Sequence, residues 1–167
     1  MSQEQDNVMK LLEKKHYKYM KEAFKEAQKA FLKDEVPVGA VVVYNDKIIA
    51  RAHNLREKNQ SFMAHAEFLA MQKASKKLGS WRLEDCDVYV TLEPCPMCAG
   101  AMIQGRVRHV YYAAQDNKAG ATGSVIDLFE TPFNHKVLKT GGIMADESKE
   151  LLQTFFKKLR EKWHFSL

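Results

Sequence analysis

Apolar residues recur every three or four positions in three long segments of the chain, which predicts amphipathic helices. In the first segment, residues 13–33, lysines occupy one side and apolar residues the other: Met20, Phe24, Ala27 and Phe31. The second helix should begin at or near His65 and stop at Gly79, because glycine favours the left-handed conformation that ends helices. The third covers residues 146–163, with acidic residues in its first turn and basic residues in its last, as the helix dipole favours.

Shorter runs rich in valine, isoleucine and tyrosine predict strands between these helices. The expected strands span residues 38–44, 48–51, 87–92, 108–113 and 136–139. The first two are separated by Asn45-Asp46-Lys47, which predicts a hairpin turn. A short helix should open at Pro94-Cys95-Pro96 and run to about Gln104. Residues 115–135, rich in glycine, asparagine, aspartate and proline, predict a long loop with room for one helical turn, and loops of this length are usually functional.

This order of helices and strands predicts an α/β fold in which helices pack on a central sheet. At 167 residues the chain fits one domain. We expect that domain to span residues 16–167, with residues 1–15 as an N-terminal extension that could be flexible. The composition, 46% hydrophobic and 28% charged, is typical of a folded globule and not of a disordered chain.

No segment of the sequence predicts a membrane span or a secretion signal. The longest apolar run, residues 36–44, is far too short to cross a bilayer, and residues 1–15 lack an apolar core followed by a cleavage site. We therefore expect a cytoplasmic protein. The formal net charge of +5 favours an anionic partner such as RNA, although charge alone is a weak signal. A basic stretch near the C-terminus could equally be a solvated helix face: Lys157, Lys158, Arg160 and Lys162.

Two of the three cysteines, Cys95 and Cys98, lie at the predicted start of a helix. Both sulfurs then lie on one face of the helix and can reach a single ion. The unpaired N–H groups and the positive end of the helix dipole lower the pKa of thiols there, which favours the thiolates that a metal requires. An odd number of cysteines in a cytoplasmic protein also argues against a disulfide framework.

His65 and Glu67 are expected to approach the same site from the second helix. Residues two apart on a regular helix point to nearly opposite sides, so these two converge only if His65 lies where the helix begins. His65, Cys95 and Cys98 form a ligand set that suits Zn²⁺, with bonds of about 2.0 to 2.3 Å. Glu67 lies next to the metal without being needed as a ligand, so it is the candidate proton carrier.

The fourth ligand decides whether such a site is catalytic. Water in that position would be activated, because Zn²⁺ lowers the pKa of bound water to about 7. Cys86 is the rival ligand, but at about 3.3 Å per residue the intervening strand carries the chain on the order of 20 Å away. We therefore expect Cys86 to be a small buried apolar residue.

Two other interpretations use the same cysteines. One is a purely structural zinc site. The other is a thiol–disulfide oxidoreductase of the glutaredoxin kind, in which Cys-Pro-Met-Cys would be the redox motif. The redox interpretation explains nothing at His65 or Glu67, and it places the motif unusually late in the chain.

Two motifs together resemble the signature of cytidine deaminase-like zinc hydrolases: His65-Ala66-Glu67 and Pro94-Cys95-Pro96-Met97-Cys98. Over residues 16–163 the flanking segments resemble one branch, the bacterial tRNA-specific adenosine deaminases: EVPVGAVVV at 35–43, Asn54, TLEPCPMCAGAMI at 91–103 and DNKAGATGS at 116–124. The resemblance implies a three-layer fold, with a central mixed sheet of about five strands flanked by helices.

The resemblance also assigns roles to individual residues. It implies one Zn²⁺ per subunit, bound by His65, Cys95 and Cys98, with Glu67 moving protons from the zinc-bound water to the base. Asn54 would hydrogen-bond the target base; the alternative from the residue alone is that it closes a turn. Further substrate contacts would come from Glu35, Pro37, Val38, Ala66 and Pro94 around the pocket, from Asp116 and Lys118 with Gly120 and Gly123 in a groove loop, and from Asn134 with His135 in a second segment.

By the same resemblance, the expected reaction is hydrolytic deamination of adenosine to inosine at the wobble position of tRNA, with an arginine tRNA as the expected species. The partner would be the anticodon stem-loop, whose unpaired bases cost less to extrude than bases in a duplex. The resemblance further implies a homodimer. Free guanine deaminases and other nucleobase or nucleoside deaminases carry the same zinc signature, so they are the alternative function.

Overall fold

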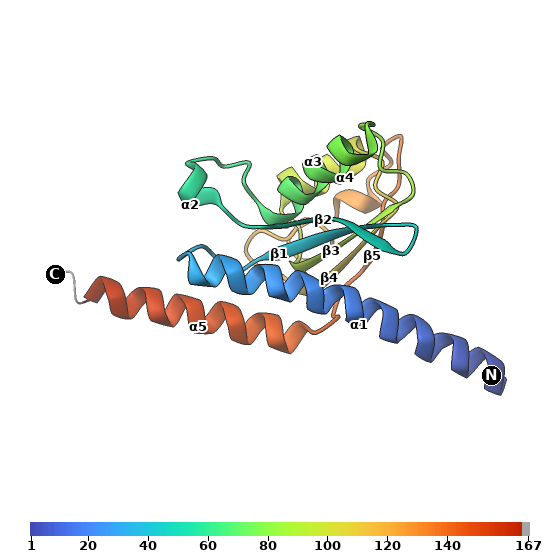
Figure 1. Ribbon diagram of the computed structural model, residues 1–167, viewed down its shortest axis with the longest axis horizontal. Coiled ribbons are helices and arrows are strands. Elements are labelled where there is room, and N and C mark those ends of the chain that lie inside the picture. Colours follow the sequence, from blue (N-terminus) through green and yellow to red (C-terminus); the bar gives the residue numbers. More distant parts are fainter. Residues whose placement is uncertain (165–167) are drawn as a thin grey trace.

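A five-stranded sheet lies between helices on both of its faces (Figure 1). The structure is a computed structural model that describes residues 1–164, so the last three residues of the expected domain lie outside the described part. The strands are β1 (Gly39–Tyr44), β2 (Lys47–His53), β3 (Cys86–Leu92), β4 (His109–Ala114) and β5 (Leu138–Thr140). The helices are α1 (Gln3–Leu32), α2 (Arg56–Asn59), α3 (Ala66–Leu78), α4 (Pro96–Gln104) and α5 (Ala145–His164), with one 3₁₀ turn at Leu128–Glu130.

The strand order is β2-β1-β3-β4-β5, and the sheet is mixed. β1 runs antiparallel to β2 and β3, whereas β3, β4 and β5 are parallel to one another. Parallel neighbours need a crossover connection, and α4 supplies it between β3 and β4. The carboxyl end of β3 therefore leads directly into the start of α4, where the two predicted cysteine ligands lie.

The pleat of the strands divides the core into two halves. On β1, Ala40 and Val42 pack with residues of α3 and α4, whereas Val41 and Val43 pack with residues of α1. Alternate residues of a strand point to opposite faces, so a strand that is buried on both faces is apolar throughout. Figure 1 shows the result, with α3 and α4 over one face and α1 and α5 over the other. This confirms the predicted three-layer α/β architecture.

The hairpin between β1 and β2 is a two-residue turn. Tyr44 pairs with Lys47, and the residues between them, Asn45 and Asp46, have φ values of 48° and 60°. Asparagine and aspartate tolerate this left-handed conformation, which the twist of a tight hairpin requires. The predicted turn is confirmed, except that Lys47 belongs to the strand and not to the turn.

The first helix begins at Gln3, well before the predicted start near residue 13. Ser2 and Gln5 form a capping box, in which the Gln5 N–H donates to Ser2 Oγ at 3.2 Å and the Ser2 N–H donates to Gln5 Oε1 at 2.9 Å. The prediction was late because it relied on apolar periodicity toward the core, and the buried positions of α1 begin only at Tyr19. Residues 3–15, which belong to the expected N-terminal extension, are helical and extend past the sheet (Figure 1).

Glycine lets α1 lie directly on the start of β1. A Cβ on Gly39 would lie 2.0 Å from the carbonyl oxygen of Ala23, far inside any van der Waals contact. The remaining differences from prediction are small: α2 was missed, and β5 begins two residues later than expected. Within residues 1–164, no helix is both long and apolar enough to cross a membrane.

Candidate functional site

Two helix starts bring the predicted metal ligands together. His65 is the N-cap residue of α3 and Cys95 is the N-cap residue of α4, and both have extended backbones. Neither side chain caps its own helix, so both are free to turn toward each other. His65 Nδ1 lies 3.5 Å from Cys95 Sγ and 3.6 Å from Cys98 Sγ. The predicted position of His65 at the start of its helix is confirmed.

The donor set fits a tetrahedral ion. A sulfur at about 2.3 Å and a nitrogen at about 2.0 Å from such an ion lie about 3.5 Å from each other, which is the separation observed. All three candidate ligand atoms lie within 4.8 Å of one another. Two cysteines and a histidine are the ligand types that zinc prefers, and three protein ligands leave one position open. The residues present therefore fit a metal ion.

The thiols of Cys95 and Cys98 have pKa values shifted in opposite directions. The pKa of Cys95 is lowered to about 4, chiefly by its hydrogen bond with the Cys98 thiol and further by His65. The same bond and burial raise the pKa of Cys98, while the bond with Cys95 raises the pKa of His65. Cys95 therefore carries the negative charge, while Cys98 and His65 keep their protons more strongly. A bound metal ion would displace those protons.

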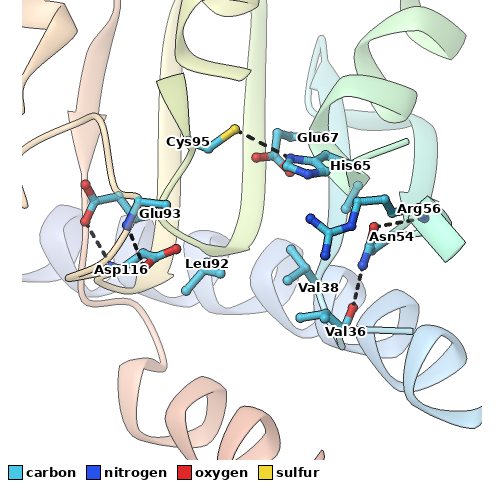
Figure 2. A pocket seen from close by; sticks show the side chains of 12 residues that line it. Val36, Val38, Asn54, Arg56, His65, Glu67, Leu92, Glu93, Cys95 and Asp116 are labelled. Atoms are coloured by element: carbon cyan, nitrogen blue, oxygen red, sulfur yellow. Dashed lines mark hydrogen bonds between the residues drawn. The ribbon is translucent and has the colours of Figure 1, made fainter. Parts of the chain in front are cut away.

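Glu67 lies in the first turn of α3 and is 4% exposed. Figure 2 shows its carboxyl group beside the His65 ring, on the side that faces Cys95. Burial raises the pKa of this carboxyl group. It therefore holds a proton at higher pH than an exposed glutamate does, which is what a group that both accepts and donates protons requires.

A cavity of about 200 Å³ opens next to these residues (Figure 2). It is lined by Val36, Val38, Asn54, Arg56, His65, Ala66, Glu67, Leu92, Glu93, Cys95, Asp116 and Ala119. Pockets for drug-sized ligands usually enclose about 300 to 1,000 Å³. A smaller cavity with apolar walls and a few convergent polar groups suits a single heterocyclic base.

Asn54 lines the cavity with its side-chain amide already oriented. Its Nδ2 donates to the Val36 carbonyl at 3.2 Å, and its Oδ1 accepts from the Arg56 N–H at 3.2 Å. The amide is 7% exposed and retains one donor and one acceptor site beyond these bonds. Asn54 therefore both closes the turn before α2 and offers polar atoms to a ligand, so its two sequence interpretations are compatible.

Eight residues expected around the substrate do not line this cavity: Glu35, Pro37, Pro94, Lys118, Gly120, Gly123, Asn134 and His135. Glu35 is 1% exposed, and its carboxylate accepts hydrogen bonds from the backbone N–H groups of Glu57 and Lys58 at 2.9 and 3.0 Å. It thus holds the start of α2 and turns away from the pocket. Pro37 and Pro94 are buried, whereas Lys118 and Asn134 are exposed.

The expected residues that do line the cavity are His65, Glu67, Cys95, Asn54, Val38, Ala66 and Asp116. Cys98 does not line it but is buried 3.6 Å from His65 Nδ1. Sequence reasoning missed the other five lining residues: Val36, Arg56, Leu92, Glu93 and Ala119. Arg56 is on a one-turn helix too short to have a periodic pattern. Glu93 did carry a signal, because a charged residue directly after a buried strand and before two ligands must have partners in the interior.

Cys86 lies at the other end of β3 from the site. It is fully buried in the core between the sheet and the helices α3 and α4, and burial raises the pKa of its thiol to about 11. A neutral thiol in an apolar environment is a poor metal ligand. The prediction that Cys86 is a small core residue is confirmed.

Comparison with known proteins agrees with this geometry. The family profile of the MafB19-like deaminases matches residues 14–160. A tRNA-specific adenosine deaminase of Bacillus subtilis (strain 168) is 53% identical over 145 residues, which are 86% of this chain and 90% of that protein. The chain belongs to the tRNA-specific adenosine deaminase family. The resemblance inferred from the two motifs and their flanking segments is thereby confirmed.

Solved structures of deaminases have the same fold as this chain. A chain from work on A-to-I editing by tRNA:A34 deaminases at the wobble position of transfer RNA is 42% identical, with a TM-score of 0.78, over 80% of this chain and 98% of that chain. A guanine deaminase from Nitrosomonas europaea is more distant, at 25% identity and a TM-score of 0.70 over 83% of each chain. The tRNA-specific adenosine deaminase family therefore shares its fold with deaminases of free bases.

Proposed function

We propose that this protein deaminates adenosine to inosine at the wobble position of tRNA. The observation that carries the proposal is a cavity of single-base size whose end is formed by His65, Glu67 and Cys95. The membership of the chain in the tRNA-specific adenosine deaminase family supports the substrate. Adenosine deamination replaces the exocyclic amine of the base with an oxygen from water. The reaction therefore needs a group that activates water and a group that carries protons, both at the end of the cavity where the amine lies.

His65, Cys95 and Cys98 would hold one Zn²⁺ ion per chain. When bound there, the ion acts as a Lewis acid that lowers the pKa of water to about 7. The two helix N-termini favour the thiolate charge that holds the ion in place. Glu67, within the same cavity end, would move protons to the ring nitrogen and to the departing amine, which is general acid–base catalysis.

The opposite walls of the cavity would orient the base. Asn54 offers a donor and an acceptor to the ring edge, as a neutral amide can. Val38 and Leu92 supply apolar surface for the ring faces. Arg56 lies at the cavity on the same side as Asn54 (Figure 2), where its guanidinium suits a phosphate of the nucleotide. Lys118 and Asn134 remain predicted contacts for nucleotides outside the base pocket.

An anticodon loop suits this arrangement, because its bases are already unpaired and can be extruded at low cost. By resemblance we also propose an arginine tRNA as the substrate and a homodimer. From the sequence we further propose a cytoplasmic location and a single deaminase domain that starts near residue 16. Sedimentation of the purified protein tests the homodimer, with a mass of twice 19.2 kDa as the expected result.

Asn54→Ala tests the orientation of the base. We expect the turnover of an anticodon stem-loop to fall by about one to two orders of magnitude, the scale of losing a good hydrogen bond at the reacting base. Zinc content and Tm are measured with kcat and KM, because Asn54 also bonds to Val36 and Arg56. Asn7→Ala, on the exposed first turns of α1, is the matched control and should behave as wild type. Unchanged turnover in Asn54→Ala would show that Asn54 does not orient the substrate.

Salt dependence tests whether the substrate is a polynucleotide. Each phosphate neutralised by the protein releases counterions, so the logarithm of the tRNA affinity should fall linearly as the logarithm of the salt concentration rises. Binding of free adenosine should show almost no slope. A flat response for tRNA would contradict recognition along a phosphate backbone.

A second candidate function is deamination of free guanine, which the fold shared with the Nitrosomonas europaea guanine deaminase favours. Both candidates use the same metal site, so the substrate must decide between them. The test compares ammonia release from an anticodon stem-loop with adenosine at the wobble position and from free guanine. We expect rapid release from the stem-loop and negligible release from guanine; an equal or faster rate with guanine would overturn the proposed function.

A further inference from the structure

A buried carboxylate lies directly before the metal-ligand segment and takes no part in the proposed chemistry. Glu93 follows β3 and is 2% exposed. Its Oε1 accepts from the Asp116 N–H at 3.2 Å, and its Oε2 accepts from the N–H groups of Thr122 at 3.1 Å and Ser124 at 3.2 Å. The Ser124 hydroxyl also donates to Oε1. All four donors belong to one loop, residues 116–124, which wraps around the carboxylate.

The backbone of this loop is fitted closely to the carboxylate. A Cβ on Gly120 would lie 2.3 Å from Glu93 Oε2 and 2.5 Å from the carbonyl oxygen of Asp116. Only a residue without a side chain leaves room for the carboxylate at this point. Several backbone N–H groups converging on one anion form a concave binding site of the kind that proteins use for phosphate groups. Here the anion is part of the chain itself.

The same loop forms one wall of the base cavity. Asp116 and Ala119 both line the cavity. Figure 2 shows Asp116 across the cavity from Asn54 and Arg56. The loop is also bonded to the ligand segment, because the Ala121 N–H donates to the carbonyl oxygen of Pro94 at 2.8 Å. The distance between this wall and Cys95 is therefore set by the contacts of Glu93 and Pro94 with the loop.

We propose that Glu93 is a positioning residue for the deaminase reaction: its carboxylate orders the loop 116–124 and so fixes the cavity wall of Asp116 and Ala119 relative to the metal-ligand segment. This inference rests on the proposed function for its effect on the substrate, but not for its effect on the loop. Glu93 acts through the loop and does not need to touch the reacting atoms.

The loop has a second attachment to the sheet, which does not involve Glu93. Lys139 of β5 donates to the Thr122 carbonyl oxygen at 2.6 Å and pairs with Asp127. Loss of the carboxylate should therefore loosen residues 116–124 locally without unfolding the domain. This makes the role of Glu93 measurable in a folded protein.

Two substitutions test the proposal, one in the carboxylate and one in the loop that binds it. Glu93→Gln keeps the size of the side chain but places an NH₂ group against N–H donors, and Gly120→Ala places a methyl group against the carboxylate. Asp87→Asn is the control for the change from carboxylate to amide, because Asp87 lies on β3, the strand that Glu93 follows, and pairs with Arg108 and not with the loop. Zinc content, Tm, amide hydrogen exchange, and kcat and KM for the stem-loop are measured for all four proteins.

We expect Glu93→Gln and Gly120→Ala to retain zinc and to exchange the amides of Asp116, Thr122 and Ser124 at least about tenfold faster than wild type, while the amides of β1 and β3 keep their rates. KM for the stem-loop should rise about tenfold, with a smaller change in kcat, because the wall holds the substrate and the reacting groups stay in place. Asp87→Asn should match wild type in zinc content, in amide exchange at residues 116–124, and in kcat and KM.

Two results would overturn the proposal. Unchanged exchange at residues 116–124 in both variants would show that Glu93 does not order the loop. Faster exchange with unchanged KM and kcat would show that the loop order does not position the substrate. A wild-type protein without activity on the stem-loop would refute the proposed function instead, and the exchange rates would still decide whether Glu93 orders the loop.

Discussion

Replacing Glu67 with glutamine is expected to lower the turnover of an anticodon stem-loop by about two to four orders of magnitude. Glutamine keeps the size and the hydrogen-bonding capacity of the side chain but cannot carry a proton. The proposed reaction needs protons delivered to the ring and to the leaving amine, and Glu67 is the carboxyl group at the end of the cavity beside His65 and Cys95. Single-turnover kinetics measure the loss directly.

Zinc content separates proton transfer from metal binding in this variant. Glu67 is not among the clustered candidate ligands, so Glu67→Gln should bind zinc as wild type does. Glu84→Gln, with a 62% exposed side chain, is the matched control for the change from carboxylate to amide. Normal turnover in Glu67→Gln would refute the role of proton carrier, and loss of zinc would show that Glu67 is a ligand.

Replacing Cys98 with alanine is expected to remove both the metal and a large part of the stability. A ligand present at about 1,000 times its Kd stabilises the folded state by about 4 kcal/mol. In a domain of this size each kcal/mol shifts Tm by about 2 to 4 °C, so Tm should fall by about 8 to 16 °C. Elemental analysis and thermal unfolding in the presence of zinc measure the two effects.

Cys86→Ala is the matched control for Cys98→Ala. Both cysteines are fully buried, but Cys86 lies in the apolar core at the far end of β3. Its loss should cost about 1 kcal/mol, or about 2 to 4 °C in Tm, with no change in zinc content. Loss of zinc in Cys86→Ala, or retention of zinc in Cys98→Ala, would contradict the assigned ligand set.

The metal-site cluster could be predicted because its members are positioned by local structure. Cys95 is the N-cap residue of α4 and Cys98 lies in its first turn, so their spacing alone places both sulfurs on one side. His65 required a further argument, namely that it converges with Glu67 only at a helix start, and its position as the N-cap of α3 agrees. Sequence spacing is sufficient when one turn of helix sets the geometry.

Contacts between distant segments could not be predicted in the same way. Glu35 was expected at the substrate, yet its carboxylate accepts from N–H groups 22 and 23 residues later in the chain. Glu93 likewise bonds to donors 23 to 31 residues away. Which buried carboxylate faces a ligand and which faces a backbone depends on how loops pack, and no periodic pattern encodes that packing.

The start of α1 was mispredicted for a different reason. The prediction followed the apolar face that the sheet buries, but the first turns of the helix extend past the sheet and bury little. Val8, Leu11 and Leu12 are all exposed there. The capping box at Ser2 and Gln5 was the local signal that marks the true start.

The most direct test of the proposed function is to sequence bulk tRNA before and after incubation with the zinc-loaded protein. Inosine pairs as guanosine does during reverse transcription, so deamination reads as a change from A to G. We predict this change at the wobble position of an anticodon, with Glu67→Gln as the inactive control. No change at any wobble adenosine, with a protein that is folded and carries one zinc ion per chain, would contradict the proposed function.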